Sequence, residues 1–208
     1  MKSSPLPPLT VQVVLFTLIR SVLNTSYRMV YPYLSLFQSG LGVGLPAISL
    51  VLTLRSLIAF AGPFLSPIAD RYGRRVSMLL GMGLFTLGAL MVVGLPDYRG
   101  FAVSLPLMAL AYILFLPAMQ AYLGDRVPYE RRGRVMGITE LSWSLSFMVG
   151  VPLVGLLLGR SGAWQSPFLP LALLGGLSLL GLWRILPGDR PPAPEEGRPR
   201  LRLCRLAG

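Results

Sequence analysis

Six long apolar runs, separated by short polar segments, constrain this 208-residue chain more than any other feature of its sequence. A helix needs about 20 apolar residues to cross the hydrocarbon core of a bilayer. Backbone inside lipid must satisfy its own hydrogen bonds, and these runs are too long and too uniform for the alternating strands of a membrane barrel. We therefore predict an all-α membrane protein with six transmembrane helices. They cover residues 9–37, 44–68, 76–95, 101–123, 135–158 and 164–186.

The composition excludes several other classes of protein. The net charge of +11 would suggest a nucleic-acid partner in a soluble protein, but here the arginines lie between apolar runs. We therefore expect a lipid bilayer as partner and no nucleic acid. Histidine is absent and Cys204 is the single cysteine, which excludes a histidine-based triad, a histidine metal site and an intrachain disulfide. We predict no enzymatic activity, no metal and no cofactor.

The distribution of Lys and Arg predicts the orientation in the membrane. Fourteen of the 19 basic residues lie on the side that holds both termini, two lie on the other side, and three lie within the apolar runs. Cytoplasmic loops carry the excess of positive charge, so both termini are expected in the cytoplasm. The predicted organisation is a cytoplasmic N-terminus at 1–8, a transmembrane domain at 9–186 and a cytoplasmic Pro/Arg-rich linker or tail at 187–208.

Three arginines fall inside predicted spans, where charge is expensive and often functional. In the first run, polar residues recur at helical spacing and form one face, which should point to protein or to a water-filled cavity. Pro32 should kink the end of this run. The candidates for contacts in a substrate cavity are Arg20, Asn24, Tyr27, Arg28 and Arg55. Alternatively, each arginine snorkels or is held by backbone carbonyls and by Glu140.

Glu140 is the one charged residue within the fifth run. It is a candidate for a proton-coupling carboxylate. The alternative, which we favour, is a structural partner for an arginine or for polar groups at the cytoplasmic end. The same run carries Gly150 and Pro152, which together can bend a helix.

The loop after the second run reads Asp70-Arg71-Tyr-Gly73-Arg74-Arg75, in which Gly73 permits a turn with positive φ. This pattern resembles the signature loop between helices two and three of the major facilitator superfamily of transporters, although Ser66 stands where that signature has glycine. The loop after the fourth run, Gly124 to Arg134, resembles the superfamily's loop between helices four and five and contributes Asp125 and Arg134.

The resemblance implies an architecture and roles for these residues. In this superfamily, two six-helix halves enclose a substrate near mid-membrane; helices one and four line the cavity, and helices two and five face the other half. Asp70 would latch the cytoplasmic side against the other half. The gating and motif residues would be Asp70, Arg71, Gly73, Arg74, Arg75, Asp125 and Arg134. The arginine often found in helix four of proton-linked exporters is absent from the fourth run.

These observations predict that the chain is the amino-terminal half of a secondary transporter that moves a small organic solute by alternating access. Its expected partners are the bilayer, the solute, and either a carboxy-terminal six-helix half or a second copy of the chain. A homodimeric transporter and a six-helix structural or assembly protein are the alternatives. The composition, rich in Arg, Gly, Pro and Leu, favours a bacterial plasma membrane.

Overall fold

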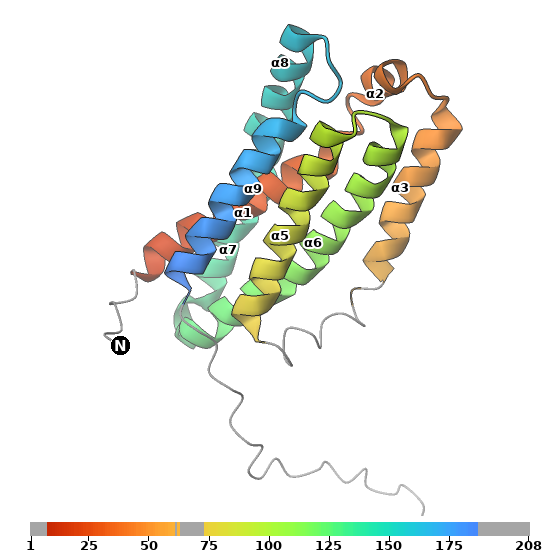
Figure 1. Cartoon of the computed structure of the whole chain (residues 1–208). Helices are drawn as coiled ribbons and strands as arrows, with labels where there is room; N and C mark the ends of the chain where they lie inside the picture. The colour runs from red at the N-terminus through yellow and green to blue at the C-terminus, as the bar shows by residue number, and fades with distance from the viewer. Residues whose placement is uncertain (1–7, 61, 63–72, 187–208) are drawn as a thin grey trace, which may run out of the picture.

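The computed structural model describes residues 8–60, 62 and 73–186, and every regular element in these ranges is a helix (Figure 1). The elements are α1 (Leu9–Arg28), α2 (Leu34–Leu41), α3 (Leu45–Phe60), α5 (Arg74–Gly94), α6 (Tyr98–Arg126), α7 (Tyr129–Leu145), the π-helical turn η1 (Ser146–Gly150), α8 (Val151–Ser161) and α9 (Phe168–Ile185). The prediction of an all-α fold is confirmed.

Five of the described helices are long and apolar enough to cross a membrane, and α7, η1 and α8 together form one of them, the 33-residue helix Tyr129–Ser161. A sixth span is reached if α2 and α3, which meet at a bend of 116°, are taken as one. The described part of α3 has 16 residues, and the rest of the second predicted run lies outside the described residues.

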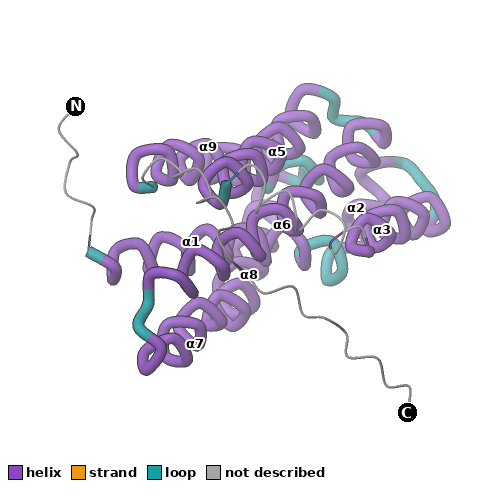
Figure 2. Tube along the Cα trace, turned by 90° about the horizontal axis from the view of Figure 1, so that it is seen from below, coloured by secondary structure: helices purple, strands orange, loops and turns teal. Residues whose placement is uncertain are grey.

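The helices pack in layers that Figure 2 shows along the bundle axis. Helix α5 packs against α6 and α9, while α1 packs against α6 and α9 and also against α7. Helix α3 lies at the edge and packs on α6. The start of α1 and the end of α9 lie at the same end of the bundle, as an even number of passes requires (Figure 1).

The first predicted run, 9–37, is not one helix. Helix α1 ends at Arg28, a turn occupies 29–33, and α2 begins at Leu34. The predicted bend near Pro32 is therefore a full break. Proline lacks an N–H and disfavours helical backbone in the residue before it, so the helix cannot continue through this point.

The fifth run contains a different irregularity. The five-residue π-turn η1 ends two residues before Pro152, which has no N–H to offer the preceding turn and would crowd its carbonyl. A widened turn accommodates the ring. A Cβ at Gly150 would collide with the Thr25 side chain, so α1 approaches this turn closely.

Glycines on α5 permit its close packing on α6. A Cβ at Gly81 would lie 2.9 Å from the backbone oxygen of Ala111 and 3.2 Å from Cβ of Phe115. A Cβ at Gly83, two residues along the same helix, meets nothing within 4 Å. Gly81 is therefore an interface position, and Gly83 has room for a side chain.

Gly81→Ala should lower the free energy of unfolding by about 1–3 kcal/mol, because the added methyl group meets backbone that cannot move independently. Gly83→Ala is the matched control. It should be neutral or stabilising, since alanine favours helix over glycine by about 1 kcal/mol. Unfolding of the two variants in detergent checks this, and equal destabilisation by both would contradict the described α5–α6 packing.

Candidate solute cavity

A cavity of about 330 Å³ lies between α1, α3, α6 and α7. We call it the central cavity. Its described lining residues are Asn24, Tyr27, Arg28, Tyr31, Ala59, Ala109, Tyr112, Ile113 and Trp143. Three of the five predicted cavity candidates, Asn24, Tyr27 and Arg28, are among them. The predicted polar face of the first run therefore borders a cavity over its second half.

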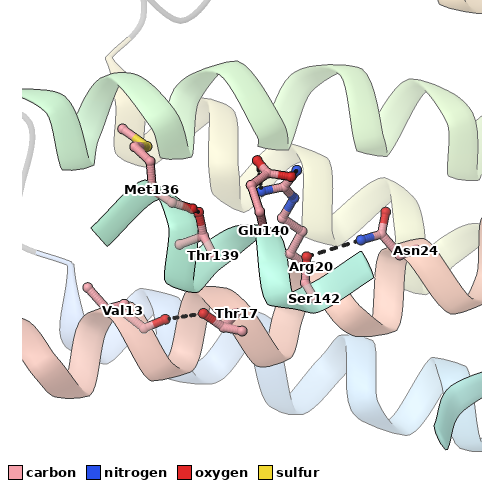
Figure 3. A network of polar contacts seen from close by, with 8 residues as sticks. All are labelled: Val13, Thr17, Arg20, Asn24, Met136, Thr139, Glu140 and Ser142. Carbon is pink, nitrogen blue, oxygen red and sulfur yellow. Dashed lines mark hydrogen bonds and ion pairs between the residues drawn. The ribbon is translucent and has the colours of Figure 1, made fainter. Parts of the chain in front are cut away.

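Arg20 does not line this cavity but forms an ion pair with Glu140 across α1 and α7 (Figure 3). Its Nη1 and Nη2 donate to the two carboxylate oxygens of Glu140 at 2.6 and 2.7 Å. The Arg20 side chain is 4% exposed and that of Glu140 is 52% exposed. The geometry is that of the structural partner favoured for Glu140 above, and proton coupling by Glu140 stays a prediction.

One turn along α1, Asn24 makes the second polar contact between these helices. Its amide nitrogen donates to Oγ of Ser142 at 3.2 Å, and both residues are buried (Figure 3). We call the pairs Arg20–Glu140 and Asn24–Ser142 the α1–α7 polar contact. Buried polar groups need such partners, and these two pairs fix the register of α1 on α7.

Arg55 is 1% exposed and binds the end of α1. Its Nη1 donates to the Tyr27 carbonyl at 2.8 Å, its Nη2 donates to Oη of Tyr31 at 2.9 Å, and its guanidinium stacks 4.0 Å from the Tyr27 ring centroid. Tyr27 carries one of the last four carbonyls of α1, which have no partner within the helix. A cation at this end also complements the helix dipole. A substrate contact by Arg55 stays a prediction. The Tyr27 carbonyl that Arg55 binds lies about two turns along α1 from Arg20.

Arg28, the last residue of α1, has aromatic neighbours. Its guanidinium carbon lies 3.7 Å from the ring centroid of Trp143 and 4.2 Å from that of Phe147. Its Nη1 is buried and has no hydrogen-bond partner among the described residues. The cation is therefore held by ring faces and keeps a free donor beside the cavity.

Two aromatic residues of the cavity, Tyr112 and Trp143, were missed by the sequence analysis. Tyr112 lies within an uncharged apolar run that offers no polar periodicity, and Trp143 resembles an ordinary lipid-facing residue. The ring of Tyr112 lies 6.0 Å from that of Tyr27, centroid to centroid. Only the packing of α6 and α7 against α1 brings these rings together.

At the other end of the bundle, residues of the two predicted motif loops meet. Gly73 has φ 93° and precedes α5, as predicted. Nη1 of Arg74 forms an ion pair with Asp125 and donates to the Ala121 carbonyl at 2.7 Å. Asp70 and Arg71 lie outside the described residues.

Two further motif residues lie at this end. Arg75 donates from Nη2 to the Trp183 carbonyl on α9 at 2.8 Å. Arg134, with Arg131, lines a separate cavity of about 310 Å³ between the starts of α1 and α7. A gating role for any of these motif residues stays a prediction.

The family profile of the Major Facilitator Superfamily matches residues 16–204, nearly the whole chain. The chain belongs to this superfamily. The resemblance seen in the two loops is thereby confirmed, and the protein is a multi-pass membrane protein of a transporter family. The first and fourth predicted spans, α1 and α6, supply six of the nine described residues that line the central cavity.

Several curated members of the superfamily are similar to the chain. The uncharacterized MFS-type transporter YwfA of Bacillus subtilis (strain 168) is 36% identical over 122 residues, which cover 58% of this chain and 29% of YwfA. The uncharacterized MFS-type transporter YbcL of the same organism is 26% identical over 188 residues, covering 88% of this chain and 47% of YbcL. The inner membrane transport protein YdhP of Escherichia coli (strain K12) is 26% identical over 168 residues, covering 78% of this chain and 43% of YdhP. The chain thus spans less than half the length of each.

Proposed function

We propose that the chain forms the amino-terminal six-helix half of a secondary transporter, and that a small organic solute binds in the central cavity during alternating access. The observation that carries this proposal is the central cavity itself. Its volume of about 330 Å³ falls in the range of small-molecule sites, roughly 300–1,000 Å³. Its walls place Asn24, Arg28 and three tyrosines beside one space.

We also propose what forms the missing wall of this cavity. In the superfamily, substrate sites lie near the bilayer midplane between two six-helix halves. Charged and polar groups such as Arg28 avoid lipid and face protein or water. We therefore propose that a second six-helix half covers this face, and that both termini of the present chain are cytoplasmic in a bacterial plasma membrane.

The motif residues support a proposed cytoplasmic gate. The Arg74–Asp125 ion pair joins the beginning of α5 to the end of α6, at the end of the bundle where α1 begins and α9 ends (Figure 1). Such a pair can hold the motif loop in place while the halves separate and close. By the resemblance, Asp70 would form the latch to the other half.

Solute release from proteoliposomes tests the proposed function. Vesicles are loaded with a bacterial cytosolic extract, and the released solutes are identified by mass spectrometry. The chain alone should release solutes no faster than protein-free vesicles, whereas the chain reconstituted with the six-helix half that completes it should release a small set of organic solutes. Release by the chain alone would indicate a homodimeric transporter instead. No release by the completed pair would contradict transport.

A further inference from the structure

The chemistry of the central cavity indicates the class of solute. We propose that it takes an organic anion with an aromatic body, and that Arg28 binds the anionic group. This inference rests on the proposed function only in calling that ligand the transported solute. The binding itself can be tested without transport.

The charges around the cavity are not balanced. The Arg20 charge is compensated by Glu140, whose two carboxylate oxygens accept from it. The two terminal nitrogens of Arg55 donate hydrogen bonds to Tyr27 and Tyr31 at the end of α1. Among the described residues that line the cavity, Arg28 is the one charged side chain, and no described ion pair includes it. The cavity therefore carries a net positive charge.

The state of the Arg28 guanidinium also favours an anion. Its faces stack over Trp143 and Phe147, which stabilises the cation. That contact leaves the edge N–H groups of the guanidinium available. Nη1 is buried and lacks a partner among the described residues, and a buried donor without an acceptor is unfavourable. A carboxylate or similar anion supplies both the acceptor and the missing charge.

The rest of the cavity lining is mainly aromatic and apolar. Tyr27, Tyr31, Tyr112 and Trp143 surround the cavity with rings, while Ala59 and Ala109 leave room. The amide of Asn24 already donates to Ser142, so it offers the solute less than a free amide would. Ring faces favour an aromatic body through offset stacking and edge contacts. A cationic solute would be repelled by the Arg28 charge, and a neutral one would leave that charge uncompensated.

The test measures binding to the full chain in lipid nanodiscs. Trp164→Phe and Trp183→Phe leave Trp143, which lines the cavity, as the single tryptophan and reporter. The probes are 2-naphthoate, 2-naphthalenemethanol and 2-naphthylmethylammonium, which share one ring system and differ in charge. Quenching of Trp143 fluorescence should saturate with 2-naphthoate at a Kd at least about tenfold below that of the alcohol, equivalent to about 1.4 kcal/mol. The ammonium probe should not saturate.

Variants of Arg28 assign the effect to its charge. Arg28→Gln should raise the Kd for 2-naphthoate about tenfold or more and leave the Kd for the alcohol nearly unchanged. Arg28→Lys should recover part of the affinity, because it keeps the charge but not the planar fork. Arg160→Gln, an exposed arginine at the end of α8, is the matched control and should bind as the parent chain does.

Three outcomes would overturn the inference: equal affinity for the three probes, no saturable binding of 2-naphthoate, or unchanged affinity in a folded Arg28→Gln variant. If Arg28→Gln does not fold, Arg28→Lys provides the test instead. An Arg28→Lys variant whose affinities for the alcohol and for 2-naphthoate fall equally would also overturn the inference. Anion binding that depends on Arg28, together with no solute release by the completed pair, would contradict transport and keep this inference. Release of solutes by the completed pair without a preference for anions would support transport and contradict this inference.

Discussion

Glu140→Gln is expected to destabilise the chain more than Arg20→Met does, although the two substitutions remove the same ion pair. Glu140→Gln leaves the Arg20 cation in a site where its side chain is 4% exposed. Breaking a buried pair in this way costs about 3–5 kcal/mol, and we expect the lower end because Glu140 is half-exposed. Arg20→Met keeps the apolar stem and leaves a carboxylate that is much less enclosed than the arginine. Unfolding of each variant in mixed micelles by increasing denaturing detergent measures both costs.

The double variant provides the control for this asymmetry. Arg20→Met combined with Glu140→Gln leaves no isolated charge between α1 and α7, so it should be more stable than Glu140→Gln alone. The charge exchange Arg20→Glu with Glu140→Arg should fall between the parent and Glu140→Gln. If Arg20→Met proved the more damaging change, or if the double variant showed the sum of the two losses, the pair would not stabilise the α1–α7 contact as described.

The membrane architecture was predictable from the sequence because the bilayer sets a length that each apolar run must match. The boundaries inside a run were less predictable. Pro32 predicted a kink in the run 9–37, but apolar residues continue on both sides of it, so the run was predicted as one span although the helix ends at Arg28 and a new one begins at Leu34. Periodicity detects which residues share a face, but it does not detect where the helix that carries them stops.

The partners of the buried arginines show the same limit. Glu140 was predicted as a possible partner for an arginine, and in the structure it pairs with Arg20. Arg55 also falls inside a predicted span, yet it caps the end of α1. The partner of each arginine depends on which groups of the neighbouring helices lie beside its guanidinium. The sequence of a single run does not contain that information. The same holds for the places of Tyr112 and Trp143 at the cavity.

The account depends above all on the central cavity being filled with water while the outer faces of the bundle meet lipid. Reactivity of single cysteines, in a Cys204→Ser background, measures this directly. Tyr27→Cys and Tyr112→Cys place a thiol on the cavity wall at partly buried positions. Leu173→Cys and Leu177→Cys place one on α9, where the parent residues are 62% and 65% exposed. Met29→Cys is the control for a fully buried position.

A membrane-impermeant thiol reagent requires water and a thiolate at the site of reaction. With the chain in liposomes, we expect the cavity positions to react at least about tenfold faster than those on α9. The α9 positions are more exposed in the isolated bundle. They should nevertheless react slowly, because apolar surroundings suppress the ionisation of a thiol. Fast reaction at Leu173→Cys and Leu177→Cys with slow reaction at Tyr27→Cys and Tyr112→Cys would contradict the central cavity as a solute pathway.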